Sequence, residues 1–184
     1  PSFVPLGCEV FGNEPDAVNL WIGDGRAVSS CHKDFYENLY MVVRGEKHFT
    51  LLPPAAVAFL HEQPCKPARF ERCHGDFQVV EDAPTESLVQ WIPFDVTSAK
   101  DQVSKCFPHF AQAPVVNAVV KEGEMLYLPA MWYHRVAQKG LTIAVNYWHD
   151  MAFGAAYVMY QFVRDSQGLD EALENDDDDE DDAP

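Results

Sequence analysis

The chain has few basic residues and lacks the patterns that mark several classes of protein. Its 13 Lys and Arg are outnumbered by 29 Asp and Glu, so no basic surface is expected that could hold a nucleic-acid backbone. No apolar run reaches the roughly 18 residues that a membrane span needs, and no signal peptide is recognisable. We therefore expect neither direct nucleic-acid binding nor membrane insertion.

The five cysteines are odd in number and show no Cys-x-x-Cys spacing. A disulfide framework is therefore not expected, and the predicted location is a reducing compartment, the cytoplasm, the nucleus or both. A zinc site at Cys65, Cys73 and His74 is disfavoured, because two thiols and one imidazole without tight spacing seldom form one.

The negative charge is concentrated near the C-terminal end. Residues 170–184 hold ten acidic and no basic side chains, which leaves a net charge of −6 for residues 1–169. A like-charge run of this kind is expected to be disordered, either as a solvated tail or as an arm for basic partners. We predict one domain over residues 1–165, followed by an acidic disordered tail over residues 166–184.

What the chain does contain is a series of short β-rich runs separated by turn signals. This pattern is typical of an antiparallel barrel or jelly roll, a mainly β fold. The expected strands are residues 17–23, 26–31, 38–43, 46–52, 115–121, 125–128, 132–137 and 141–148, with short strands near 77–80 and 88–92, and a helix over 151–163. The dipeptide at residues 44–45 predicts a two-residue hairpin turn, and residues 55–112 are expected to form an irregular insertion.

A His-x-Asp pair at His32 and Asp34 is the first candidate metal site. Residues two apart on a strand face the same side, so this imidazole and this carboxylate point together. His134, in a late β-rich run, is the best candidate for a third ligand. Two imidazoles and one carboxylate form the face that holds Fe(II) in non-haem oxygenases and leaves positions free for an oxo acid and O₂. Such a pair is common by itself, so the assignment depends on a co-substrate site nearby.

The predicted hairpin supplies candidates for that co-substrate site. A turn at residues 44–45 would place six residues on one face of the hairpin: Asn38, Tyr40, Val42, Lys47, Phe49 and Leu51. The His-x-Asp pair would share this face if the first strand extends back toward it. Lys47 would then point into an apolar barrel, which is unfavourable unless an anion neutralises its charge. The far carboxylate of 2-oxoglutarate is such an anion, and the Tyr40 hydroxyl could donate to it. The alternative is a solvent face, where a lysine is ordinary.

Two further polar residues are candidates for the pocket wall. Asn146 lies on the last strand, which should neighbour His134, and could bind the oxo acid or could be a satisfied buried amide. Ser29, three residues before His32, could add a hydroxyl.

Together these residues resemble the jumonji-C (JmjC) oxygenases. The matching pattern is Ser29-x-x-His32-x-Asp34-x-x-x-Asn38, followed by Lys47, His134 and Asn146. In more detail, the sequence of residues 32–40, 43–49 and 123–130 is similar to the jumonji domain-containing protein seven branch, a branch of bifunctional peptidases and (3S)-lysyl hydroxylases. The resemblance spans most of residues 17–150.

The resemblance implies a double-stranded β-helix, a cupin-like jelly roll with flanking helices. It implies the following site: Fe(II) on His32, Asp34 and His134; 2-oxoglutarate held by Lys47 and Tyr40 and lined by Asn38, Ser29 and Asn146; and Trp148 and Tyr36 near the substrate. It also implies a protein substrate with a target lysine, such as a GTP-binding protein, and a homodimer. The family carries a sizeable region before its first barrel strand, and most of that region is expected to be missing here.

Three other functions compete with a lysyl (3S)-hydroxylase. A zinc peptidase acting on histone-like tails would use the same ligands, but the sequence has no HExxH motif and no obvious glutamate base beside the ligands. A histone lysine demethylase would share both the metal and the co-substrate. A non-catalytic cupin-like binding module would have no need for Lys47 together with three ligands.

Overall fold

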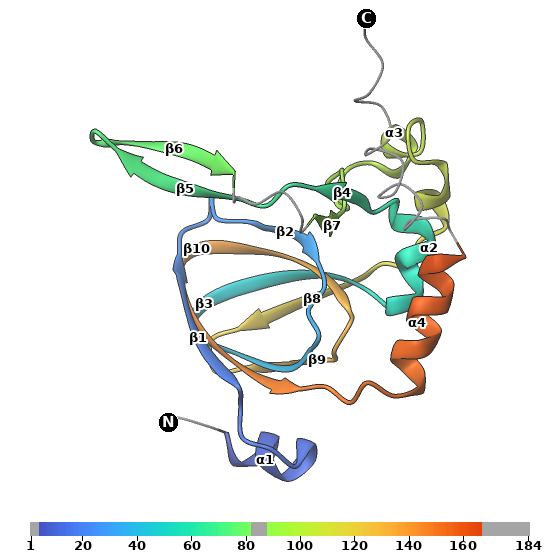
Figure 1. Cartoon of the computed structure of the whole chain (residues 1–184). Coiled ribbons are helices and arrows are strands. Elements are labelled where there is room, and N and C mark those ends of the chain that lie inside the picture. Colours follow the sequence, from blue (N-terminus) through green and yellow to red (C-terminus); the bar gives the residue numbers. More distant parts are fainter. Residues whose placement is uncertain (1–3, 82–87, 167–184) are drawn as a thin grey trace, which may run out of the picture.

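The computed structural model describes residues 4–81 and 88–166. Its centre is a six-stranded antiparallel sheet that curls into a barrel, and most of the helices lie on one side of it (Figure 1). The strands are β1 (Ala17–Gly23), β2 (Ser29–His32), β3 (Tyr36–Leu52), β4 (Gln63–Cys65), β5 (Ala68–Cys73), β6 (Asp76–Glu81), β7 (Val89–Trp91), β8 (Val116–Lys121), β9 (Met125–Leu128) and β10 (Tyr133–Asp150). The helices are α1 (Pro5–Phe11), η1 (Pro54–Ala56), α2 (Val57–Leu60), α3 (Lys100–Val103), η2 (Pro108–Gln112) and α4 (Ala155–Asp165).

Two long strands, β3 and β10, organise the barrel. β10 pairs with β1 along residues 142–148 and with β2 at His134. β3 pairs with β9 along residues 38–41 and with β8 along residues 46–51, and the two long strands also pair with each other. Because each long strand has two short partners in succession, it runs through both halves of the fold. This arrangement is the jelly roll that the sequence predicts.

The predicted hairpin turn at residues 44–45 is wrong. Residues 36–52 form one continuous strand, β3, and the two runs predicted after residue 131 likewise merge into β10. Gly45 has the positive φ of 85° that its turn signal suggests, but the chain bends there at a bulge instead of reversing. A Cβ on Gly45 would lie 2.7 Å from the backbone oxygen of Leu141, so the close approach of the two long strands requires the glycine.

The predicted shared face nevertheless exists, for a different reason. Val43 has no partner on β10, because Val42 and Arg44 pair with consecutive residues of that strand. This extra residue shifts the alternation of side chains by one. Lys47 therefore lies on the same buried face as Val42 and Tyr40, as the wrong hairpin would also have placed it.

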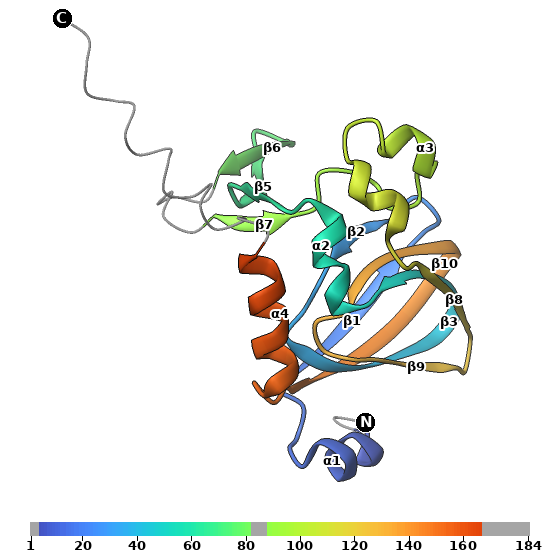
Figure 2. The same cartoon turned by 90° about the vertical axis from the view of Figure 1, so that its right-hand side faces the viewer.

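Two apolar clusters fill the fold. The barrel interior is packed with Tyr40, Val42, Phe49, Leu51, Val120, Leu128, Val136 and Ala144. A second cluster lies where the helices cover the barrel and includes Leu52, Val57, Leu60, Phe110, Tyr133 and Tyr160. Figure 2 shows α2 and α4 side by side against the barrel. The helix predicted over residues 151–163 begins later, at Ala155, after the N-cap residue Gly154.

The insertion after residue 53 is more ordered than the sequence suggests. The strands predicted near residues 77–80 and 88–92 correspond to β6 and β7, but β4, β5 and the N-terminal helix α1 were not predicted. β5 and β6 form a hairpin that projects from the barrel (Figure 1). Within the described residues no helix has both the length and the hydropathy needed to cross a bilayer. Nearly all of the predicted acidic tail lies outside the described residues.

Candidate metal and co-substrate site

Strands β2 and β10 bring the three predicted metal ligands together. His32 pairs directly with His134, and Asp34 follows in the link between β2 and β3. The Nε2 atoms of His32 and His134 lie 3.9 and 3.6 Å from Oδ2 of Asp34, and the three potential ligand atoms all lie within 4.8 Å of one another. Small inward shifts would therefore place two imidazoles and one carboxylate around a single ion.

No second cluster of this kind exists in the part of the chain that the structure describes. The alternative zinc site at Cys65, Cys73 and His74 therefore has no structural support.

Backbone carbonyls orient both imidazoles. Nδ1–H of His32 donates to the carbonyl of Ser30 at 2.7 Å, and Nδ1–H of His134 donates to the carbonyl of Trp132 at 3.0 Å. This assigns each ring proton to Nδ1 and leaves the Nε2 lone pair facing Asp34. Burial lowers the pKa of His134, and the nearby His32 lowers it further. His134 is therefore neutral near pH 7, which is the form that binds a metal.

One buried carboxylate connects the two segments that carry the ligands. Oε1 of Glu62 accepts hydrogen bonds from Nζ of Lys33 at 2.7 Å and from the hydroxyl of Tyr133 at 2.9 Å. Lys33 lies between the two ligands of the His-x-Asp pair, and Tyr133 precedes the third ligand. The ammonium of Lys33 also lies over the rings of Tyr133 and Tyr160, 5.1 and 5.4 Å from their centroids. Nothing in the sequence pattern singled out Glu62.

The open side of the triad faces a cavity of about 90 Å³. Besides the three ligands, its wall consists of Trp21, Ser29, Asn38, Tyr40, Lys47, Phe49, Leu128, Val136, Asn146 and Trp148. The volume is several times what one water molecule needs, so a small ligand has room beside the metal position. Nine of the ten predicted site residues meet at this cavity, and only Tyr36 lies outside its wall.

Lys47 brings a buried positive charge into this wall. The residue is 7% exposed, and its Nζ donates to Oε1 of Gln138, a neutral acceptor. Burial lowers the pKa of Lys47, and no charge in the described residues opposes that effect. The ammonium is therefore poised to receive an anion.

The hydroxyl of Tyr40 adds a second donor on the same face. Burial raises the pKa of Tyr40, so the hydroxyl keeps its proton at any physiological pH. The ring is held edge-on against Phe49, with the centroids 5.1 Å apart. An ammonium and a phenol on one wall are suited to a carboxylate.

The two predicted asparagines bind each other. Nδ2 of Asn146 donates to Oδ1 of Asn38 at 3.1 Å, and Oδ1 of Asn146 accepts from the indole N–H of Trp21 at 2.8 Å. Asn146 thus has the partners of a satisfied buried amide while it lines the cavity. Trp21, on β1, was not predicted as a site residue, because only the pairing of β1 with β10 brings it to Asn146.

Two aromatic stacks lie beside the site. Trp148 stacks on Tyr36 with centroids 4.9 Å apart, and the Tyr36 hydroxyl donates to Oδ2 of Asp16 at 3.2 Å. Trp91 stacks on His32 at 5.8 Å. Trp91 belongs to the insertion and carries no sequence signal of its own, so the sequence analysis missed it.

Comparison with known proteins agrees with this geometry. The profile of the cupin-like domain family matches residues 2–155. The human bifunctional peptidase and (3S)-lysyl hydroxylase JMJD7 is 44% identical over 163 residues, which is 88% of this chain and 50% of that protein. JmjC domain-containing protein E of Dictyostelium discoideum is 36% identical (95% of this chain, 54% of that protein), and lysine-specific demethylase JMJ32 of Arabidopsis thaliana is 42% identical (85% and 48%).

The chain spans about half the length of these curated relatives. JmjC proteins use Fe(II) and 2-oxoglutarate, the two cofactors that the sequence predicts, and the His-Asp-His group fits the metal. With its jelly roll, its cupin-like profile and these relatives, the chain belongs to the cupin-like domain family, within its JmjC group.

Proposed function

We propose that this chain is the catalytic part of an Fe(II)- and 2-oxoglutarate-dependent oxygenase that hydroxylates a lysyl side chain of a protein. One observation carries the proposal. Lys47 is a buried ammonium with a neutral partner, in the wall of the cavity onto which the metal triad opens. A buried cation is unfavourable unless an anion pairs with it, and the far carboxylate of 2-oxoglutarate is that anion.

The iron, when bound, supplies oxygen activation: 2-oxoglutarate and O₂ give succinate and CO₂, and the remaining oxygen atom enters a C–H bond of the substrate to form an alcohol. The chain itself provides placement. Lys47 and Tyr40 hold the far carboxylate, which directs the oxo-acid end toward the ligands. Apolar wall residues such as Phe49 and Leu128 keep water from the reacting centre.

The rim of the site supports a cationic substrate. The hydrogen bond and the charge of Asp16 raise the pKa of Tyr36, and Asp150 and Asp34 add to this effect. Asp16 thus contacts Tyr36 and the charge of Asp150 also acts on it, so the stacked pair of Tyr36 and Trp148 has acidic neighbours. A lysine ammonium is attracted both by carboxylates and by aromatic faces. The name of the human relative, a (3S)-lysyl hydroxylase, supports the same substrate class.

A lysine demethylase is the second candidate, because the Arabidopsis relative carries that name. It would use the same metal and co-substrate, and it would differ only in oxidising a methyl group on the lysine nitrogen. Peptidase activity also occurs in the name of the human relative. We propose a lysine-bearing protein substrate, such as a GTP-binding protein, in the cytoplasm or nucleus.

Mass spectrometry of a lysine peptide, incubated with the protein, Fe(II), 2-oxoglutarate and O₂, separates these functions. Hydroxylation adds one oxygen atom to the peptide, demethylation removes a methyl group from a methylated peptide, and peptidase activity shortens it. Succinate should form in step with the product, and Asp34→Ala should abolish both. Peptide cleavage independent of 2-oxoglutarate, or full activity of Asp34→Ala, would contradict the proposal.

A further inference from the structure

Gln138 is the partner of Lys47, and both polar ends of its amide are engaged. Gln138 lies on β10 and is 7% exposed. Its Oε1 accepts from Nζ of Lys47, and its Nε2 donates to the backbone oxygen of Asp24 at 2.7 Å. A backbone oxygen can only accept, so the amide must direct its nitrogen to Asp24 and its oxygen to Lys47. The protein thus gives a buried ammonium a hydrogen bond without giving it a negative charge.

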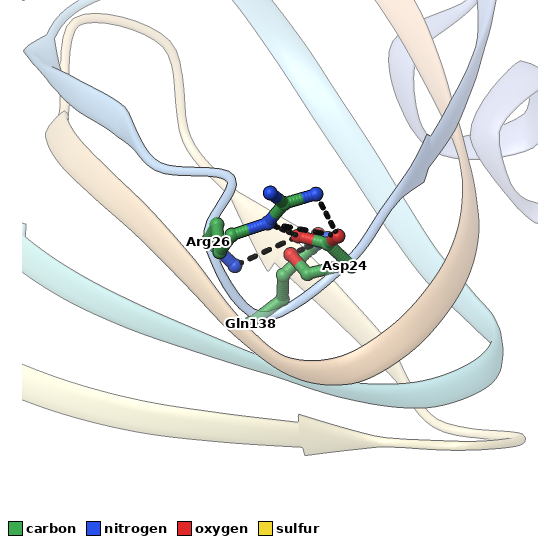
Figure 3. A network of polar contacts seen from close by, with 3 residues as sticks. All are labelled: Asp24, Arg26 and Gln138. Atoms are coloured by element: carbon green, nitrogen blue, oxygen red, sulfur yellow. Dashed lines mark hydrogen bonds and ion pairs between the residues drawn. The ribbon is translucent and has the colours of Figure 1, made fainter.

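The turn that anchors Gln138 is itself ordered. Figure 3 shows the Gln138 amide reaching the backbone of Asp24, whose carboxylate is held by Arg26. The Arg26 guanidinium lies 2.7 Å from Oδ2 of Asp24, and the Arg26 backbone N–H donates to Oδ1 at 3.0 Å. The Asp24 backbone oxygen also accepts from the N–H of Ala27 at 3.0 Å. These bonds fix the position of the oxygen that Gln138 uses.

Packing confines the amide as well. A Cβ on Gly23 would lie 2.5 Å from Nε2 of Gln138, so a side chain at this position on β1 would displace the amide. On the far side, Gln138 and Lys47 border a second cavity of about 160 Å³, whose wall also includes Gly23 and Ile22. Lys47 belongs to the walls of both cavities, as do Trp21, Ser29 and Val136, whereas Gln138 lines only the second. Gln138 therefore holds Lys47 from outside the metal-facing cavity.

We propose that Gln138 determines co-substrate recognition: its neutral amide holds Lys47 in place while leaving the charge free for the oxo diacid. This inference rests on the proposed function, because it assumes that Lys47 receives the far carboxylate. Gln138 is a positioning residue, since it acts through Lys47. A carboxylate at this position would neutralise Lys47 and repel the co-substrate, although its size would be the same.

Calorimetric titration of the Mn(II)-loaded protein without O₂ tests the charge argument. The titrants are 2-oxoglutarate and 2-oxoadipate, which is one carbon longer. Gln138→Glu should weaken 2-oxoglutarate binding by about a hundredfold, because it places an ion pair where the ligand's own pair forms. Gln102→Glu, an exposed site on α3 with the same change of charge, should bind within about twofold of the original chain.

Gln138→Ala tests the positioning argument and keeps the proposal testable if Gln138→Glu fails to fold. Removing the side chain takes away the hydrogen-bond partner of Lys47 without adding charge. An ammonium that is no longer held in place should discriminate less between the two acid lengths. The ratio of 2-oxoadipate to 2-oxoglutarate affinity should therefore rise by about fivefold or more, and 2-oxoglutarate should lose about tenfold at most. An unchanged ratio in Gln138→Ala would overturn the positioning argument.

Two further outcomes separate this inference from the function on which it rests. If the original chain binds 2-oxoglutarate and Gln138→Glu binds it equally well, the inference fails and the proposed function stands. Equal loss in Gln138→Glu and Gln138→Ala would likewise refute it, because a merely structural role weakens both alike. If the original chain binds neither acid, the proposed function fails, and the inference falls with it.

Discussion

Replacing Lys47 with methionine isolates the group on which the co-substrate site depends. Lys47 is buried, its Nζ donates to Gln138, and no described carboxylate offsets its charge. Methionine is unbranched and nearly as long, so the apolar contacts of the stem with the barrel interior are kept. The substitution therefore removes the ammonium and little else.

The size of the effect follows from the burial of the charge. Truncating one partner of a desolvated, hydrogen-bonded charge pair weakens binding by about 2–5 kcal/mol, which corresponds to roughly a 30-fold to several-thousandfold rise in Kd for 2-oxoglutarate. The ligand-free protein should change much less. Losing the buried charge relieves a desolvation penalty, whereas the Gln138 oxygen left without a donor costs about 1–3 kcal/mol. These two terms offset each other.

The assay is titration of 2-oxoglutarate into Mn(II)-loaded protein, together with urea unfolding of the ligand-free chain. Lys66→Met is a matched control, because Lys66 is an exposed lysine whose ion pair with Glu81 is long, at 3.8 Å. A Kd for Lys47→Met within about threefold of the original would refute the assignment of Lys47 as the carboxylate receptor, since a charge-assisted contact cannot be worth so little in a buried site.

Three further predictions concern the charges around the site. Because burial lowers the pKa of Lys47 below its ordinary 10.5, 2-oxoglutarate affinity should fall as pH rises through that lowered pKa. Between that lowered pKa and pH 10.5, the unfolded chain binds more protons at Lys47 than the folded chain, so the contribution of Lys47 to the unfolding free energy should rise with pH. This rise should be absent in Lys47→Met. If the difference in unfolding free energy between the two proteins does not change with pH, the prediction is wrong. Glu62→Gln should lower the unfolding free energy by about 3 kcal/mol in urea titrations, because Lys33 loses its buried counter-charge. Glu71→Gln is the control in an exposed ion pair, and it should change the unfolding free energy by about 0.5 kcal/mol at most. Asp16→Asn should raise the KM for a lysine peptide about threefold at unchanged kcat, while an unaltered KM would argue against an acidic rim.

The sequence alone was sufficient for the fold class and for most of the cavity wall. β1 and β9 have the predicted bounds, because their short β-rich runs end at Gly and Pro signals that act locally. The His-x-Asp pair, Lys47 and Tyr40 could be found from their residue types and spacing. Side-chain alternation along a strand does not place them by itself, because Asp34 follows the end of β2 and Lys47 reaches the face of Tyr40 through the bulge at Val43.

Only the tertiary structure decided which strands pair and which side chains meet. A glycine signal at residues 44–45 is compatible with a turn or with a bulge, and only the pairing of β3 with β10 distinguishes them. Glu62 and Gln138 gain their roles from contacts 71 and 91 residues away in the chain, and no local pattern records such a contact. The metal ligands and the co-substrate residues could therefore be identified from the sequence, whereas the residues that hold them in place are determined by long-range packing.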